Sequence, residues 1–136
     1  MKTSDYKELQ VWQKAMDLVV EVYNIIKLLP KEETYGISDQ IRRSAVSIPS
    51  NIAEGQSRNS SKEFIQFLSI ARGSLAELET QLLICVKVNM LSNDNIDNIL
   101  IATKEIGKMI KGLMNKLEAQ LTTNKYENST YNIRIE

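Results

Sequence analysis

The stretch QIRRSAVSIPSNIAEG, residues 40–55, has apolar residues at helical spacing but also contains a proline and two adjacent arginines. Its apolar residues recur at intervals of three and four and so share one helical face: Ile41, Ala45, Ile48 and Ile52. Pro49 has no amide hydrogen, and inside a helix its ring clashes with the carbonyl group four residues earlier. Because Ile48 and Ile52 stay on the same face across Pro49, we expect one continuous, kinked helix.

This helix is expected to run from about Ser38 to Glu54. The Ser38 side chain can cap its amino end, where the helix dipole also favours the carboxylate of Asp39. Gly55 suits a left-handed cap at the carboxyl end, and the polar residues after it form the connection to the next helix.

The preceding segment, Leu9 to Leu29, predicts a helix with two apolar stripes, ended by Pro30. One stripe consists of Trp12, Met16, Val19, Tyr23 and Ile26, and the other of Val11, Ala15, Leu18, Val22, Ile25 and Leu29. A single core covers only one such stripe. Apolar surface beyond the core normally marks an interface, so the doubled stripe predicts a homo-oligomer.

A third helix is expected from about Ser61 to Asn89, capped by Ser60 or Ser61. Its seam resembles that of a coiled coil: Phe64, Leu68, Ala71, Leu75, Leu78, Leu82 and Cys85. The small residues Gly73 and Ser74 would let a neighbouring helix approach closely.

A fourth helix follows, capped by Ser92 or Asn93, and is expected to end near Leu121. Its apolar face consists of Ile96, Ile99, Thr103, Ile106, Ile110, Leu113 and Leu117. Four helices with short connections predict an all-α fold, an antiparallel up-down-up-down four-helix bundle over residues 1–121. Residues 122–136 are expected to form a tail. The alternation of Tyr131, Ile133 and Ile135 is a weak strand signal, and the tail is either mobile or held by a neighbouring subunit.

The composition bears on catalysis and on metal binding. The 136 residues include no histidine, which is the commonest general base near neutral pH and a frequent metal ligand. The one cysteine, Cys85, lies in an apolar run and is expected to be a buried, reduced thiol. The acidic pairs Glu32–Glu33 and Glu77/Glu79 do not converge by local geometry. The sequence therefore predicts no enzyme, no cofactor and no metal site.

No apolar run approaches the roughly 20 residues that a membrane span needs, and the polar amino-terminal segment has no secretory signal pattern. We therefore expect a cytoplasmic protein with no membrane partner.

Three stretches carry a resemblance to a known family: LQVWQKAMDLVVEVY (9–23), YGISDQIRRSAVSIPSNIAEG (35–55) and EFIQFLSIARGSLAELETQL (63–82). From Leu9 to Leu121 the chain resembles the four-helix-bundle family of 23S rRNA-intervening-sequence proteins, which is related to the accessory proteins of diversity-generating retroelements. The resemblance implies a ring of identical subunits, a homopentamer, with no settled biochemical activity. The retroelement proteins are strongly basic and associate with nucleic acid, whereas this chain has a formal net charge of zero.

Four of the five arginines fall between Gln40 and Leu75, a segment that contains five basic and two acidic residues. These arginines are Arg42, Arg43, Arg58 and Arg72. They suit bidentate contact with RNA or DNA phosphates, or ion pairs with acids across helices such as Glu54, Glu77 or Glu79. Arg43, Ser47, Ser50 and Glu54 form a polar stripe that suits solvent or a subunit contact. The leading interpretation is a non-catalytic assembly or adaptor protein, and the alternative is a weak, multivalent nucleic-acid-binding accessory factor.

Overall fold

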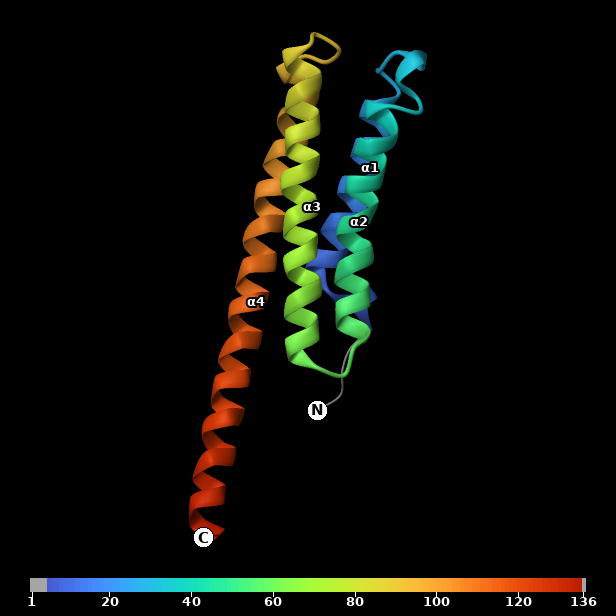
Figure 1. Ribbon diagram of the computed structural model, residues 1–136. Coiled ribbons are helices and arrows are strands. Elements are labelled where there is room, and N and C mark those ends of the chain that lie inside the picture. The colour runs from blue at the N-terminus through green and yellow to red at the C-terminus, as the bar shows by residue number, and fades with distance from the viewer. Residues whose placement is uncertain (1–4, 136) are drawn as a thin grey trace.

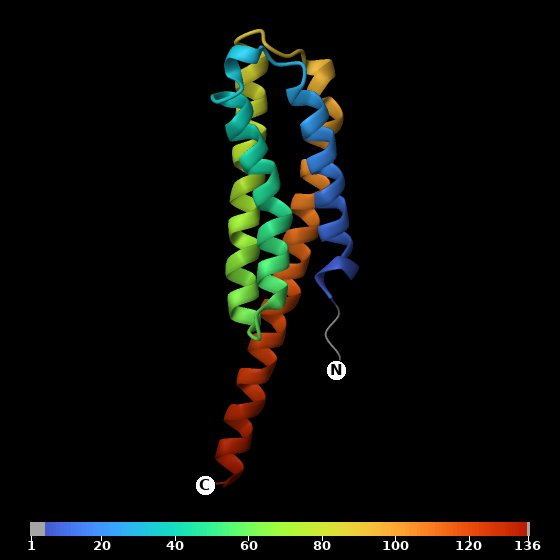
Figure 2. The same cartoon turned by 90° about the vertical axis from the view of Figure 1, so that its right-hand side faces the viewer.

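The computed structural model describes residues 5–135, with side chains described as far as Thr123. Four α-helices lie side by side (Figure 1): α1 Gln10–Ile26, α2 Ile37–Ser57, α3 Ser61–Lys87 and α4 Asn93–Ile135. Short 3-10 turns, η1 Tyr6–Glu8 and η2 Lys31–Glu33, precede α1 and α2. The α2–α3 connection lies at the end of the bundle nearest the N-terminus, and the other two connections lie at the opposite end (Figure 2). The predicted all-α fold of four helices is confirmed, and residues 5–135 contain no strand.

Each helix turns one apolar stripe toward a common core, as its spacing predicts. The largest fully buried side chains are Leu18 and Val22 of α1, Ile41, Ile48 and Ile52 of α2, Leu68, Leu78 and Leu82 of α3, and Ile96, Ile99, Ile106 and Ile110 of α4. Of the two stripes on α1, the one that contains Leu18 lines the core. The other remains partly exposed, with Met16 at 42% and Tyr23 at 41%.

The α2 helix continues across Pro49 as expected, but both of its ends differ from the prediction. Gly36 is the N-cap residue without a side-chain hydrogen bond, and Ser38 lies buried inside the first turn, so the predicted Ser38 cap is wrong. Gly55 is helical rather than a left-handed cap. A Cβ atom at Gly55 would lie 2.8 Å from Phe64 Cδ1 and 2.8 Å from Phe67 Cβ. This glycine therefore lets α3 approach α2.

Side-chain caps begin α3 and α4, as the sequence indicates. The Ser60 hydroxyl accepts a hydrogen bond from the Glu63 amide at 3.2 Å. Before α4, Ser92 Oγ accepts from the Asn95 amide and Asn95 Oδ1 accepts from the Ser92 amide, a reciprocal pair of caps. Of the two small residues predicted to let a neighbouring helix approach, Ser74 is buried and lies 2.8 Å from Ser47 of α2, whereas a Cβ at Gly73 would meet no atom within 4 Å. The prediction is therefore confirmed at Ser74 and wrong at Gly73.

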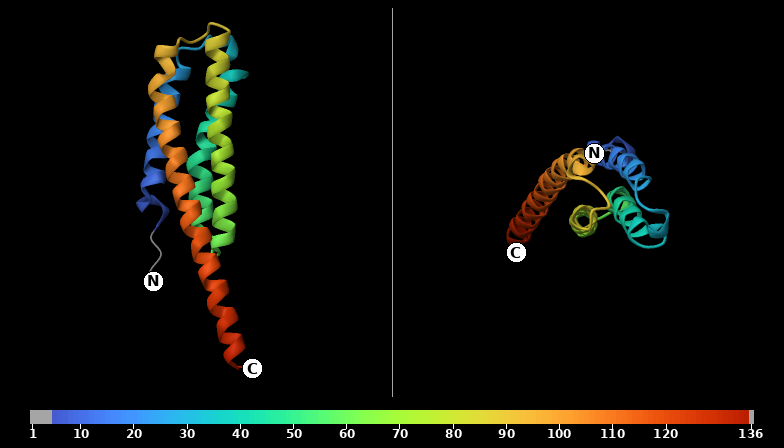
Figure 3. Two further views of the ribbon diagram at one scale, coloured as in Figure 1. Left: turned by 90° about the vertical axis from the view of Figure 1, so that its left-hand side faces the viewer. Right: turned by 90° about the horizontal axis from the view of Figure 1, so that it is seen from above.

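The α4 helix does not end near Leu121. Its backbone is helical to Ile135, so the alternation of Tyr131, Ile133 and Ile135 produces no strand. At 1.5 Å per residue its 43 residues span about 65 Å, against about 40 Å for the 27 residues of α3. The last turns of α4 therefore extend past the ends of α2 and α3 (Figure 3). A boundary between bundle and tail at residue 121 stays a prediction.

Candidate functional site

A shallow apolar groove of about 340 Å³ lies between α1 and α2. Its lining includes Tyr6, Trp12, Met16, Val19, Val46 and Pro49. The exposed stripe of α1 forms one wall, and the turn of α2 around Pro49 forms the other. Tyr6 packs edge-on against Trp12, with ring centroids 5.3 Å apart, so η1 is held against α1 by this contact. The second apolar stripe of α1, which the core does not cover, thus takes part in an apolar surface outside the core.

Pro49 is buried, and hydrogen bonds on the other side of α2 fix the turn that contains it. Asn51 Nδ2 donates to the Ser47 carbonyl oxygen at 2.8 Å and to Ser47 Oγ at 2.9 Å. Ser47 Oγ also lies 2.8 Å from Ser74 Oγ of α3. One side of this turn is thus fixed to α3 while Pro49 faces the groove.

Arg42 and Arg43 share one acceptor, Asp39, on their own helix. Arg42 Nη1 lies 2.8 Å from Asp39 Oδ1, and Arg43 Nε lies 2.9 Å from Asp39 Oδ2. The Arg42 guanidinium also lies over the Tyr23 ring, 5.9 Å from its centroid. Arg43 is free on its outer side, since 79% of its side chain is exposed.

Arg58 and Arg72 differ from this pair. Arg58 bonds to Glu54 at 2.7 Å, lies 3.7 Å from Glu63, and stacks over Phe67 with 5.0 Å to the ring centroid. Arg72 is exposed and forms no ion pair within residues 5–123.

The four arginines are close in sequence but do not form one site. Arg42 lies in the second turn of α2, and Arg58 is the C-cap residue sixteen positions later, a separation of about 24 Å along the helix axis. Of the acids expected to pair across helices, Glu54 binds Arg58 within α2, whereas Glu79 accepts the Thr103 hydroxyl of α4. The predicted polar stripe is divided as well, since Ser47 contacts α3 and Ser50 lines the groove.

Sequence reasoning missed a polar contact inside the bundle. Ser44 Oγ donates to Gln81 Oε1 at 2.9 Å, and both residues are buried. Together with the Ser47–Ser74 contact it joins α2 to α3. The available signal was the spacing of Ser44 and Ser47 beside the apolar face of α2, a pattern that fits small hydroxyl groups at a close helix contact.

Cys85 is a buried free thiol, as predicted. Burial raises the pKa of this thiol above its ordinary value of about 9, and the Glu33 carboxylate raises it further, so the reactive thiolate is disfavoured. Among the described residues, no three His, Cys, Asp or Glu side chains gather where they could hold a metal ion. No helix in that part of the chain has both the length and the hydropathy to cross a membrane.

Comparison with known proteins agrees with this description of the fold. Residues 7–112 match the family described as 23S rRNA-intervening sequence protein. The chain is also similar to a crystal structure, at 1.70 Å resolution, of a protein of unknown function from the S23 ribosomal protein family of Bacteroides thetaiotaomicron. That similarity has a TM-score of 0.71 and 28% sequence identity, and covers 76% of this chain and 97% of the other. A comparison with curated proteins gave no match. Because the family match extends over most of the bundle, the chain belongs to the family of 23S rRNA-intervening sequence proteins.

Proposed function

We propose that this protein is a non-catalytic assembly protein, an adaptor whose identical subunits join into a cytoplasmic ring. The family resemblance implies five subunits. We also infer the antiparallel up-down-up-down topology for each subunit, which the placement of the connections at alternate ends supports (Figure 2).

The observation that carries the proposal is the α1–α2 groove. Trp12 and Val19 are only half-buried within one chain, and Met16 is 42% exposed. Grouped apolar side chains at a surface favour association, because a second copy removes them from water. In a ring each interface joins two different surfaces, so the groove would receive another face of the next subunit.

Sedimentation velocity at micromolar concentration tests this assembly. We expect a single species several protomers in mass for the native chain, and smaller species for Met16→Glu, because a carboxylate in the groove would lose its hydration at the interface. Leu28→Glu is the matched control, since Leu28 is 58% exposed and lies outside the groove. A monomeric native chain, or equal loss of assembly in both variants, contradicts the proposal.

Nucleic-acid binding is the second candidate, favoured by the exposed guanidinium groups of Arg43 and Arg72. The ion pairs of Arg42 and Arg58 offset part of the positive charge that would attract phosphates. A ring would repeat the exposed arginines around its axis, so weak contacts could act together on one strand.

A further inference from the structure

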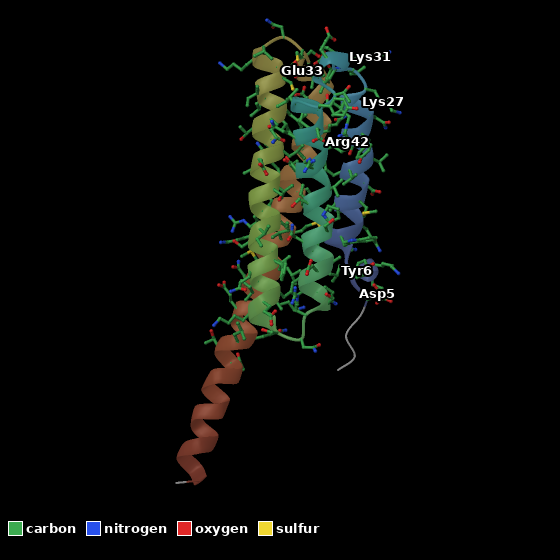
Figure 4. The ribbon with its side chains drawn as sticks, turned by 45° about the vertical axis from the view of Figure 1, so that its right-hand side comes forward. Asp5, Tyr6, Lys27, Lys31, Glu33 and Arg42 are labelled. Atoms are coloured by element: carbon green, nitrogen blue, oxygen red, sulfur yellow. The ribbon has the colours of Figure 1, made fainter. Side chains whose placement is uncertain are left out.

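A second pocket, of about 330 Å³, lies between the end of α1, η2 and the first turn of α2. Every charged side chain that lines it is basic: Lys27, Lys31 and Arg42 (Figure 4). Neither lysine forms an ion pair within residues 5–123. Asp39 pairs with Arg42 and Arg43, and neither Glu32 nor Glu33 forms an ion pair with a lysine of the pocket within residues 5–123. The pocket therefore concentrates positive charge on a chain whose formal net charge is zero.

Ser38 supplies an independent sign that the pocket takes a polar ligand. This residue is 5% exposed, it lines the pocket, and its hydroxyl makes no hydrogen bond within the described part of the chain. No fully enclosed side-chain oxygen in that part of the chain lacks a partner. The unbonded Ser38 hydroxyl must therefore be open to the pocket rather than sealed in the core.

The other donors around the pocket are held in place. The Arg42 side chain is 30% exposed and is fixed between the Asp39 carboxylate and the Tyr23 ring, which leaves its remaining N–H groups available. The Glu33 carboxylate lies at the start of α2, where a Cβ on Gly36 would be 3.0 Å from its Oε1, so the basic side chains and Ser38, and not the helix start, suit the pocket to an anion. Ile26 and Tyr23 add apolar surface to one side of the pocket.

We propose that this pocket binds the phosphate group of a small phosphate monoester. Lys27, Lys31 and Arg42 would contact the phosphate oxygens, the Ser38 hydroxyl would donate a hydrogen bond, and the organic part of the ester would lie on Ile26 and Tyr23. Charge-assisted hydrogen bonds from the three basic side chains favour a dianion over a neutral ligand. The volume is at the lower end of the range for small-molecule sites, so the ester is small.

Isothermal titration calorimetry on the assembled protein, at neutral pH and constant ionic strength, tests this site. Phenyl phosphate should bind more tightly than inorganic phosphate, and phenol should give no binding heat. A short oligonucleotide with and without a 5′-phosphate separates a strand end from a free ester as the source of the group. Failure of phosphate binding leaves the ring proposal intact, because oligomer mass is measured separately by sedimentation.

Lys27→Gln/Lys31→Gln should weaken phenyl phosphate binding about tenfold or more, since a hydrogen bond to a charged group is worth more than a factor of ten. Lys104→Gln/Lys108→Gln on α4, the matched control, should bind as the native chain does. Ser38→Ala should weaken binding several-fold without lowering the stability of the fold, because the hydroxyl makes no hydrogen bond within the described part of the chain. Absence of phosphate binding by the native chain, equal loss in the control, or a stability loss in Ser38→Ala without any binding change overturns the proposal.

Discussion

Gly55 and Gly73 both lie inside helices, yet only Gly55 has a packing reason to lack a side chain. At Gly55 a Cβ would approach two phenylalanine side chains of α3 to 2.8 Å, closer than real Cβ contacts occur. At Gly73 the same position is open, so the glycine only adds conformational freedom to the unfolded chain. The two glycines therefore predict opposite effects of the same substitution.

We expect Gly55→Ala to lower the free energy of unfolding by about 1–3 kcal/mol, the usual cost of overpacking a well-filled contact. Gly73→Ala should raise it by roughly 0.5–1 kcal/mol, the helix preference of alanine over glycine. Urea unfolding followed by circular dichroism measures both changes. If both variants were stabilised, α3 would be able to move away from an added methyl group at Gly55 without losing stability.

The predictions that failed most often concerned the roles of single residues, such as Ser38 and Gly55. Ser38 has the chemistry of a cap, but the N-cap of α2 is Gly36, two residues earlier, and no local pattern indicates that. Gly55 has the usual composition of a helix end. Its actual role depends on Phe64 and Phe67, which the chain brings back only after it reverses direction.

At the scale of elements, apolar periodicity predicted most of the fold, because the stripe of each helix is repeated over at least four turns. The same reasoning placed the end of α4 too early, near Leu121. No proline or glycine follows Gly112, so nothing in the sequence stops the helix, and the alternation of three residues near the terminus does not outweigh that continuity. An alternation of only three apolar residues does not redirect the backbone of a helix that already extends over many turns.

The α2 helix offers a test at this scale. Pro49→Ala restores an amide donor, so the helical circular dichroism of the protein should be kept or slightly increased. The same change removes the proline ring from the groove, and we expect a smaller oligomer in sedimentation velocity. Pro30→Ala, at the other proline of the chain and outside the groove, should leave the oligomer unchanged. An intact assembly in Pro49→Ala would show that this turn has no part in subunit contact.

At the scale of the whole molecule, the candidate site shows the limit of reading charge along a sequence. The segment from Gln40 to Leu75 is basic in total, but the helices distribute its arginines along the bundle and pair three of them with carboxylates. The basic pocket instead draws Lys27 and Lys31 from outside that segment. Only the fold brings these lysines next to Arg42, so the charge of one sequence segment could not have located the pocket.

This distribution predicts weak binding of nucleic acid. We expect duplex and single-stranded RNA or DNA to bind at low salt at most, and to dissociate at physiological salt, with a log–log slope of about 0.7–0.9 per neutralised phosphate. Arg43→Gln/Arg72→Gln should abolish this binding while oligomer mass stays constant, because the Arg43 side chain is 79% exposed and Arg72 forms no ion pair within residues 5–123. Tight binding at physiological salt, or binding that survives in the double variant, would favour a dedicated nucleic-acid surface elsewhere.

The three-residue connection between α2 and α3 has a consequence for the order in which the protein folds. These two helices share the most extensive contact in the bundle, and a short connection costs little entropy to close. We expect the α2–α3 hairpin to form first and to open last. In native-state hydrogen exchange, the amides of Ile48 and Leu78 should therefore be the slowest, and those of Leu18 in α1 and Ile106 in α4 should exchange faster. The α1 and α4 helices would then detach and dock again many times during the lifetime of one closed hairpin.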